Sequence, residues 1–453
     1  MAIRGIIVLL LGVATLAGCS SSGSRVEPPN VVVIVADGLG VGDVGCFGSK
    51  DLKTPGLDAV AAGGVRFTRF YGLGESTATR ASLMTGRYPQ RYPGLEADIG
   101  PGGAGLYPQA ATLAAQGELG LQGPESVLPV AFKERGYLTA AFGKWHLGYP
   151  TRFHPRRHGF DRAFSVVGDQ CDPFHHHELS LEPVLFVNEQ PVRRMGYLTS
   201  LIGDDAADFL RHNHTQPFFL YVSFTAPNAP LRLPSDIGPR YGEDQWRRGT
   251  RETYAGIVAA LDAQVARIDA ELARLGVADR TLTLVLSPHG AAAPGSNGEL
   301  RGGRGDLYEG GLRAPLIARW PGRLPAGAQS HQVTAAFDLT ASMLGAIRAD
   351  GFFGRPLDGE DVLSDVARGR DASPRELAWR TRRDGRVNAA ILEGDLKLIR
   401  EGDAPASIQL FDLASDASES NDLAQARPRD AQRLVSRLER WERRTVPEAP
   451  RKD

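Results

Sequence analysis

Residues 30–40 read NVVVIVADGLG, and this stretch decides the fold. The part from Asn30 to Ala36 is a continuous apolar, β-branched run, which predicts a strand buried on both faces, as in parallel sheets. The run ends at Asp37 and is followed by a glycine-rich turn. Open α/β sheets place their functional sites just beyond the carboxyl ends of strands, so Asp37 is the first candidate site residue.

Two later stretches repeat this layout. Phe218 to Thr225 (FFLYVSFT) runs into Asn228, and Thr281 to Leu286 (TLTLVL) runs into Pro288 and His289. Between them, apolar residues recur every three or four positions, from Ile257 through Leu261, Val265, Ile268 and Leu272 to Leu275, and Gly276 closes this predicted helix. The alternation of strand, helix and strand predicts an α/β domain with polar residues at its strand ends.

After about residue 321 the pattern changes to shorter strand-like pieces. These cover Val387 to Leu392, Leu396 to Arg400 and Gln409 to Leu413, and a final helix places Leu434, Leu438 and Trp441 on one face. We therefore expect a small antiparallel sheet with a packing helix. The segment from Pro93 to Gly123 is glycine-rich and poorly periodic, and is predicted to be a surface excursion.

Length and charge narrow the classes of function. A chain of 453 residues fits one large α/β domain with a smaller appendage. With 52 basic against 53 acidic residues and no block of charge, the chain is not expected to bind nucleic acid. Apart from Cys19, the only cysteines are Cys46 and Cys171, which an oxidising compartment would allow to pair. Two separate buried thiols are the favoured interpretation.

The N-terminus has the pattern of a targeting signal. Arg4 precedes a short apolar run from Ile6 to Leu16, which is too short to span a bilayer. The run ends in Leu-Ala-Gly-Cys, which resembles the bacterial lipobox, whose cysteine takes a diacylglycerol before cleavage. This predicts a lipoprotein signal peptide over 1–18 and a polar tether over 19–28. The expected location is periplasmic or outer-membrane anchored, through lipid on Cys19.

The stretch richest in chemistry is 76–87, STATRASLMTGR. It resembles the sulfatase signature, C-x-P-x-R followed by T-G-R, in its serine-type form, with Ser76 in the nucleophile position and Ala78 in the proline position. A nucleophile that opens a helix faces amide dipoles that favour an anion. Taken alone, Ser76 also fits a plain helix cap.

Further motifs follow in the same order as in that family. They are 29–48 (PNVVVIVADGLGVGDVGCFG), 143–148 (GKWHLG), 302–311 (GGRGDLYEGG), 394–400 and 410–423. The chain is thus similar to the formylglycine-dependent sulfatases over nearly its whole mature length. The resemblance implies the alkaline-phosphatase-like α/β fold: a mixed, mostly parallel sheet flanked by helices, with a small C-terminal antiparallel sheet plus helix. It implies a sulfatase-like catalytic domain over 29–322 and a C-terminal subdomain over 323–453.

The resemblance also implies a mechanism and partners. In the family the signature cysteine or serine is oxidised to formylglycine, and its hydrated aldehyde attacks the sulfur of a sulfate ester. The second hydroxyl then expels sulfate as the aldehyde re-forms. For this chain, that implies formylglycine from Ser76, a radical-SAM maturase as partner, and a sulfated small molecule or glycan as substrate.

Five residues match family site positions. Asp37 matches a calcium ligand, and a carboxylate suits a hard cation. Arg80 matches the residue that orients formylglycine, and His146 matches a hydrogen-bond partner of its hydroxyls. Lys144 matches a sulfate-binding cation. Arg304 stands where the family has a second sulfate-binding lysine, so the charge is kept but the donor geometry changes.

Other positions depart from the family pattern. The second calcium aspartate is Gly38, and Pro288-His289 replaces the metal-binding pair after the later strand. The family histidine that contacts sulfate and protonates the leaving oxygen is Asn228, which cannot transfer a proton near neutral pH. Fewer carboxylates predict a weakened calcium site. The alternatives are a softer divalent ion at Asp37 and His289, replacement ligands from Asp306 or Glu299, and anion binding by Lys144, Arg80 and Arg304 without metal.

Three functions remain open at this point. The intact S-x-A-x-R signature favours a sulfatase that cleaves sulfate esters, glycan sulfates among them. The lost ligands favour a non-catalytic, sulfatase-like lipoprotein that binds anionic or sulfated ligands. A phosphoryl- or phosphonyl-transfer enzyme of the same superfamily has no distinctive feature here, and it too would need the metal ligands.

One polar cluster lies between the motifs, where the family has substrate-recognition loops. It comprises Asp172, the three histidines 175–177 and Glu178. Three adjacent histidines cannot all point one way in a regular element. A polar loop near the pocket mouth is therefore favoured over a metal site, and the metal site stays open.

Overall fold

A computed structural model describes residues 28–100, 108–123, 127–178, 184–246, 248–370, 373–383, 386–402 and 407–446. The predicted signal peptide over 1–18 and Cys19 lie outside these residues, as does all of the tether but its last residue, and they stay predictions. Within the described ranges, no helix is both long enough and apolar enough to cross a membrane.

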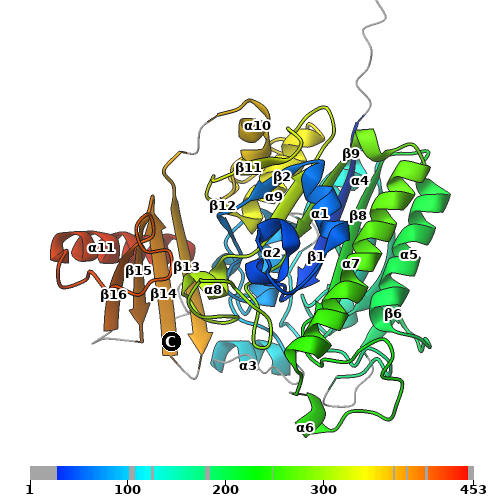
Figure 1. Ribbon diagram of the computed structural model, residues 1–453, viewed down its shortest axis with the longest axis horizontal. Coiled ribbons are helices and arrows are strands. Elements are labelled where there is room, and N and C mark those ends of the chain that lie inside the picture. The colour runs from blue at the N-terminus through cyan, green and yellow to red at the C-terminus, as the bar shows by residue number, and fades with distance from the viewer. Residues whose placement is uncertain are drawn as a thin grey trace, which may run out of the picture.

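The molecule is built on a ten-stranded sheet, and its central strand, β1 (Asn30–Asp37), is the one that the sequence singles out (Figure 1). Its neighbours β8 (Phe218–Pro227) and β9 (Thr281–Leu286) both run parallel to it, so their carboxyl ends lie at the same edge. In order, the sheet is β11 (Ala328–Ser330), β2 (Val65–Phe67), β10 (Leu316–Arg319), β9, β1, β8, β4 (Leu138–Lys144), β5 (Arg162–Val166), β6 (Leu185–Val187) and β7 (Gln190–Pro191).

Side chains of β1 alternate between two apolar cores. Val31, Val33 and Val35 pack into one core, and Val32 and Ile34 pack into the other. Every residue of β1 is buried, as the continuous apolar run predicts. The prediction of a mixed, mostly parallel sheet is confirmed, because its antiparallel pairs lie toward the two edges.

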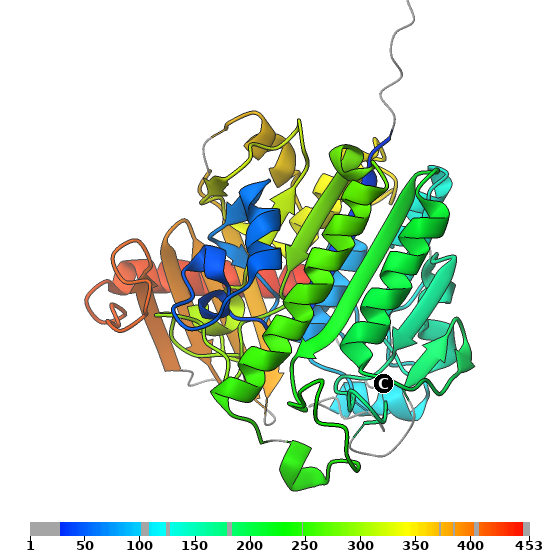
Figure 2. The same ribbon diagram turned by 45° about the vertical axis from the view of Figure 1, so that its right-hand side comes forward.

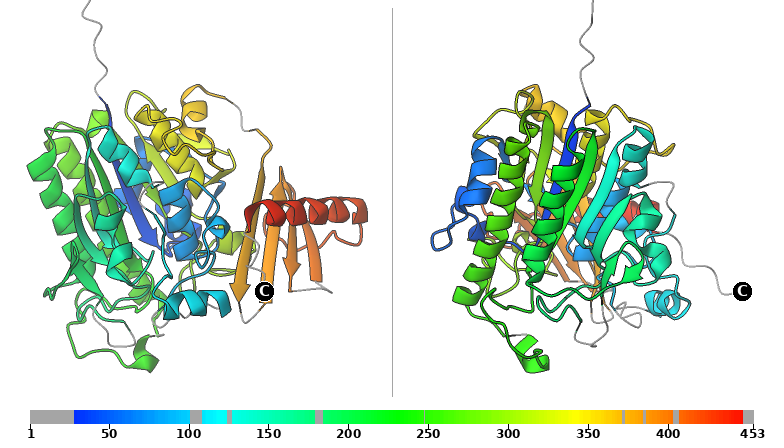
Figure 3. Two further views of the ribbon diagram at one scale, coloured as in Figure 1. Left: turned by 180° about the vertical axis from the view of Figure 1, so that it is seen from behind. Right: turned by 90° about the vertical axis from the view of Figure 1, so that its right-hand side faces the viewer.

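Helices cover both faces of this sheet (Figures 2 and 3). The predicted helix is α7 (Arg251–Arg274), which packs on one face with α5 (Leu198–Asn213) and α1 (Pro55–Ala62). The other face carries α2 (Ser76–Thr85), α4 (Leu128–Glu134) and α9 (Ala336–Ala346). Smaller elements are α3 (Pro108–Ala115), α6 (Glu243–Trp246), α8 (Glu309–Leu312), α10 (Val362–Ala367), and the paired β3 (Phe70–Tyr71) and β12 (Thr334–Ala335).

The C-terminal part forms the expected antiparallel sheet with its helix. The strands are β13 (Glu376–Arg383), β14 (Arg386–Glu393), β15 (Leu396–Glu401) and β16 (Ser407–Asp412), and α11 (Pro428–Thr445) packs across them (Figure 3). Leu434, Leu438 and Trp441 of α11 are buried, as predicted. β13 was not anticipated. The division at 322/323 stays a prediction, and β11 beyond it pairs with β2 of the large sheet.

One expectation about the chain's course is wrong in part. The segment from Pro93 to Gly123 was predicted to be a surface excursion, but Leu95, Ala97 and Ile99 are buried. Between them Glu96 contacts Arg380 of β13, so this stretch is held between the two sheets. Its lack of periodicity reflects an irregular buried path rather than exposure. Residues 101–107 lie outside the described residues, and α3 is exposed at positions 109, 111, 112 and 115. Cys46 and Cys171 are not paired.

Candidate active site

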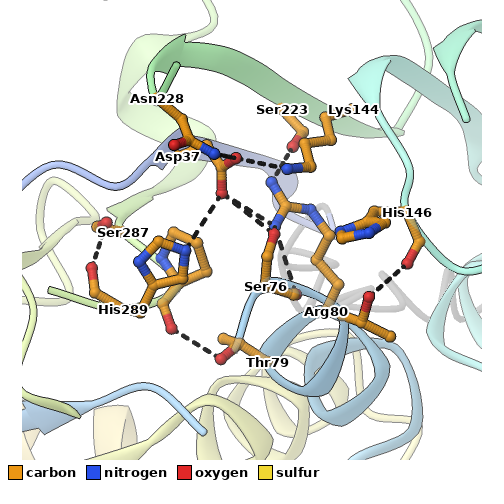
Figure 4. A network of polar contacts seen from close by, with 12 residues as sticks. Asp37, Ser76, Thr79, Arg80, Lys144, His146, Ser223, Asn228, Ser287 and His289 are labelled. Atoms are coloured by element: carbon orange, nitrogen blue, oxygen red, sulfur yellow. Dashed lines mark hydrogen bonds and ion pairs between the residues drawn. The ribbon is translucent and has the colours of Figure 1, made fainter. Parts of the chain in front are cut away.

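Four polar side chains converge where the parallel strands end (Figure 4). Asp37 ends β1, Lys144 ends β4, Asn228 follows β8 and His289 follows β9. Because these strands are parallel neighbours, or one strand removed from β1, their carboxyl ends bring the residues together.

Asp37 lies at the centre of this group, and protein donors occupy both of its oxygens. Lys144 Nζ donates to Oδ2 over 2.6 Å, and Asn228 Nδ2 donates to the same oxygen over 3.2 Å. Ser76 Oγ donates to Oδ1 over 3.2 Å, and an Arg80 nitrogen donates to Oδ1 over 3.3 Å. Asp37 and Lys144 are fully buried, so water does not screen this pair.

Ser76 and Arg80 come from the start of α2. Ser76 is the first residue of that helix and is fully buried, and Arg80 stands one turn later and donates to Ser76 Oγ. The second guanidinium nitrogen of Arg80 donates to Ser223 Oγ over 3.0 Å, which fixes its plane. The serine oxygen therefore meets both the helix N-terminus and a guanidinium, and both favour negative charge there.

Two further acids, Asp98 and Asp169, form ion pairs with Lys144 and Arg304. Lys144 Nζ also donates to Asp169 over 2.7 Å. Arg304 donates to Asp98 over 2.6 Å and lies 3.3 Å from Asp169. One nitrogen of Arg304 also donates to Asn228 Oδ1 over 3.2 Å. Thus the three predicted anion-binding cations, Arg80, Lys144 and Arg304, are each paired with a carboxylate.

These pairs set the protonation states. Burial opposes ionisation of Asp37, but the charges of Lys144 and Arg80 outweigh it and hold its pKa well below the ordinary value. For Asp98 and Asp169, burial also opposes ionisation. Arg304 lowers the pKa of Asp98, and Lys144 with Arg304 lowers that of Asp169. All three acids are therefore carboxylates at neutral pH.

The two site histidines are neutral at the same pH. Burial, with the charge of Arg304, lowers the pKa of His289 to about 4, and burial lowers that of His146 as well. His289 Nε2 points at Asp37 Oδ1 from 3.7 Å. His146 Nδ1 lies 3.8 Å from both Asp98 and Asp169, and its backbone is left-handed at φ 54°. Such a backbone is uncommon away from glycine and is found at functional sites.

A cavity of about 310 Å³ adjoins this network. Its walls include Gly38, Asn228, His289, Arg304 and Tyr254. The volume fits a small ligand group with one or two polar contacts. Asn228 and Arg304 offer an anion in this cavity an amide and a guanidinium.

The donor set does not fit the calcium ion that the family resemblance implies. Calcium takes six to eight oxygens, several of them carboxylate. Here Asp37 is the carboxylate among the matching positions, and Lys144, Arg80, Asn228 and Ser76 already bind its oxygens. Gly38 adds no ligand, and the Pro288 carbonyl accepts from Thr79 Oγ1 over 2.7 Å.

Asp306 and Glu299, the two residues proposed as replacement calcium ligands, do not complete the coordination shell. Glu299 is exposed, and Asp306 accepts the Gly303 amide of its own loop over 2.9 Å. A softer ion at Asp37 and His289 would find two protein ligands, with Arg80 beside them. Asp37 and His289 are therefore brought together as predicted, but within a network in which Lys144 and Arg80 already pair with Asp37.

Sequence reasoning missed Asp98 and Asp169. Asp169 follows the end of β5, so the rule that pointed to Asp37 could have found it. Asp98 lies on the irregular buried segment and had no such signal. The residues predicted for the site, Asp37, Ser76, Arg80, Lys144, His146, Asn228, His289 and Arg304, all lie in or beside this network.

Known proteins resemble this chain over most of its length. The model of the sulfatase family matches residues 29–349. The chain belongs to the sulfatase family. N-acetylgalactosamine-6-sulfatase of Sus scrofa is 34% identical over 381 residues, which cover 80% of this chain and 70% of that protein. Arylsulfatase A of Homo sapiens is 32% identical over 384 residues, covering 77% and 70%.

Solved structures of sulfatases share the whole fold. The structure of Ps i-CgsB in complex with k-i-k-neocarrahexaose has a TM-score of 0.79 and 27% identity, and covers 92% of this chain and 94% of its own. BT4656 in complex with D-glucosamine-2-N,6-O-disulfate has a TM-score of 0.71 at 18% identity, which shows the fold alone, over 94% of this chain and all of its own. The alkaline-phosphatase-like architecture expected from the sequence is thereby confirmed.

Proposed function

We propose that this sulfatase-family chain hydrolyses sulfate esters through a formylglycine formed from Ser76. One observation carries the proposal: Ser76 Oγ lies at the first turn of α2, hydrogen-bonded to Asp37 and Arg80. Asp37 in turn accepts from Asn228, which lines a cavity together with Arg304. A nucleophile, a helix N-terminus and cations for a sulfate group are thus grouped in one place.

The chemistry follows from these positions. A radical-SAM maturase would remove two hydrogen atoms from the Ser76 side chain to give an aldehyde, whose hydrate would supply a nucleophilic hydroxyl for the sulfur of the ester. The S–O bond to the leaving group would break as that oxygen takes a proton, and loss of the proton from the second hydroxyl would release sulfate and restore the aldehyde. Arg80, which donates to Ser76 Oγ, would orient the hydroxyls. Arg304, which lines the cavity, would neutralise charge on the sulfate oxygens, with Lys144 close by on Asp37.

Sulfated glycans are the substrate class that the relatives support. N-acetylgalactosamine-6-sulfatase, at 34% identity, is named for a sulfated amino sugar, and Ps i-CgsB, at 27% identity, binds a carrageenan-type oligosaccharide in its structure. We include small sulfate esters in the proposal, because the cavity itself is small.

The test uses the full chain co-expressed with a radical-SAM maturase. The peptide containing Ser76 should be lighter by two hydrogen atoms and should react with a hydrazide, and the protein should release sulfate from sulfated oligosaccharides. Ser76→Ala is the matched control and should lose both signals. Converted protein that releases no sulfate from glycan or aryl sulfates would contradict the proposed activity.

A non-catalytic role is the second candidate, and the saturation of Asp37 by protein donors favours it. On this hypothesis the pocket binds a sulfated or anionic ligand without turnover. It predicts that Ser76 in protein from the native organism is unmodified, and that a sulfated oligosaccharide binds equally well to the wild type and to Ser76→Ala. Conversion of Ser76 in the native organism would count against it.

We further propose that the protein is an exported lipoprotein anchored through Cys19, which the lipobox-like sequence supports. In a Gram-negative host it should fractionate with membranes and carry lipid on Cys19. Cys19→Ala should release the protein or block its processing. A wild-type protein found wholly in the soluble periplasm would overturn this proposal.

A further inference from the structure

A second group of ligand-type side chains lies in the loop that follows β5, a few residues beyond Asp169. It consists of Asp172, His175 and His177, and one ligand atom from each lies within 4.8 Å of the others. Asp172 and His177 are buried and His175 is partly exposed. None of the three contacts Asp37 or lines the cavity beside it, so the cluster is separate from the pocket proposed to bind sulfate.

His177 has the arrangement of a metal ligand. Its Nδ1 lies 2.6 Å from the Glu178 carbonyl, which can only accept, so Nδ1 carries the proton. In the neutral ring Nε2 is then the acceptor, and among the described residues this buried atom has no hydrogen-bond partner. Ligating histidines are oriented in this way, with the second nitrogen donating to a carbonyl or carboxylate. An unsatisfied buried acceptor costs stability unless something binds it.

Backbone hydrogen bonds of the loop hold Asp172 and His175 close to His177. The Asp172 amide donates to the His177 carbonyl over 3.0 Å, which closes the loop into a ring. The amides of Phe174 and His175 donate to Asp172 Oδ1 over 2.9 and 2.8 Å. His175 Nδ1 lies 3.3 Å from that same oxygen. Tetrahedral metals with bonds of about 2.0–2.1 Å separate their ligands by roughly that distance.

We propose that Asp172, His175 and His177 bind a divalent transition metal of the zinc class. Two imidazoles with one carboxylate suit zinc-like ions, whereas calcium prefers oxygen ligands. Three protein ligands leave a fourth position for water or another ligand. The ion would stiffen the loop that carries Asp169, because the Asp169 amide donates to Glu178, the neighbour of His177, over 3.0 Å.

Arg232 is the group that opposes the metal. One of its nitrogens lies 3.0 Å from Asp172 Oδ2 and 3.4 Å from His175 Nδ1. A guanidinium stays charged, so it repels a cation and competes for His175. It can keep Oδ2 while the metal takes Oδ1, which the ion would share with the Phe174 and His175 amides, at the loss of the contact between Arg232 and His175. The site should therefore bind zinc less tightly than the same ligands would without Arg232.

The test is zinc binding by the full mature protein after chelator treatment. We expect one zinc ion per chain, stabilisation against heat on adding zinc, and, with cobalt in place of zinc, the visible absorption of a tetrahedral ion. His175→Ala should weaken binding at least tenfold, and His177→Gln should do the same if it folds. His212→Ala, on the exposed face of α5, is the control and should bind as the wild type does. Arg232→Gln should tighten binding.

Two further outcomes decide between sites. Asp37→Asn should retain zinc, because Asp37 belongs to the other pocket. The proposal is overturned if the wild type binds no zinc at micromolar concentration, or if His175→Ala binds it unchanged. Zinc that is lost in Asp37→Asn but kept in His175→Ala would place the ion at Asp37 and His289 instead.

Discussion

Asp37 is a buried carboxylate whose charge is balanced by Lys144 and Arg80. Gly38 beside it has space for a side chain, since an added Cβ would meet its nearest neighbours, in His289 and Asn228, at 3.6 and 3.8 Å. Its φ of +85° makes any such side chain strained. The replacement of the family's second aspartate by glycine thus removes a ligand without filling its place.

Asn228 should limit the range of sulfate esters that are cleaved. Its side chain lies between Asp37 and Arg304 and has no transferable proton. Esters whose leaving oxygen needs a proton should react slowly, and aryl sulfates should react faster. Asn228→His in the formylglycine-containing protein should raise turnover of alkyl sulfates by about 10²–10⁴-fold, the usual contribution of a general acid.

The control for this variant is Asn228→Gln, which keeps the amide and should give no gain. Turnover of aryl sulfates should change little in Asn228→His, because their leaving groups need no proton. Equal gains on aryl and alkyl sulfates would mean that Asn228 limits binding rather than proton transfer.

His289 should make stability depend on acid pH. Its folded pKa is about 4 against an ordinary 6.5, so the unfolded chain takes up a proton between these values and the folded chain does not. Its contribution is therefore fully present above pH 6.5 and is lost as the pH falls toward 4. A shift of this size corresponds to about 3 kcal/mol. Urea unfolding from pH 7 to 4.5 should show the loss.

His289→Asn should flatten this part of the pH profile, since asparagine does not titrate. His212→Asn, which alters an exposed residue of α5, should leave the profile as in the wild type. If the wild type and His289→Asn lose stability in parallel, other groups cause the acid sensitivity.

At the scale of elements, the C-terminal sheet supports the active site. Glu96 accepts ion pairs from Arg380 and Arg382 of β13, and Gln90 donates to the Arg380 carbonyl over 2.9 Å. Asp98, which pairs with Arg304, lies two residues beyond Glu96. The small sheet thus fixes the irregular segment that supplies an acid to the site.

A buried ion cluster joins the same sheet to the first residue of α8. Lys397 Nζ of β15 lies 2.9 Å from both Glu309 and Glu419, and all three are buried. Lys397→Met would leave two carboxylates facing each other, with the longer contact from Arg313 to Glu309, 3.6 Å, as the remaining ion pair among the described residues. Breaking a buried pair in this way costs about 3–5 kcal/mol, which urea unfolding would detect.

Lys133→Met is the matched control, since Lys133 is largely exposed and pairs with Asp161 over 2.7 Å. An exposed pair contributes less than about 1 kcal/mol. A Lys397→Met protein as stable as Lys133→Met would show that the cluster does not hold the sheet in place.

For the molecule as a whole, the sequence predicted the strands whose positions follow from burial on both faces. Strands buried on both faces leave continuous apolar runs, so β1, β8 and β9 were located almost to the residue. Residues at their ends were found for the same reason. Asp98 was missed because its position depends on contacts with β13 far along the chain, which leave no local periodicity. The geometry of Asp172 and the histidines also required the folded loop.

The charges of the site balance without a metal ion. Arg80, Lys144 and Arg304 face Asp37, Asp98 and Asp169, and both histidines are neutral. Burial, together with the charge of Asp98, raises the pKa of the nearby acid Glu75 well above its ordinary value. A divalent cation would find Asp37, Asp98 and Asp169 already paired with protein cations.

The most direct measurement is a calorimetric titration of calcium into the purified mature protein, beside Gly38→Asp with Pro288→Asp. The account predicts no binding and no thermal stabilisation of the wild type at millimolar calcium, because Lys144 and Arg80 already compensate Asp37. The double variant, if it folds, should bind calcium more tightly, since it regains two carboxylates. Stoichiometric calcium in the wild type, lost in Asp37→Asn, would contradict the account.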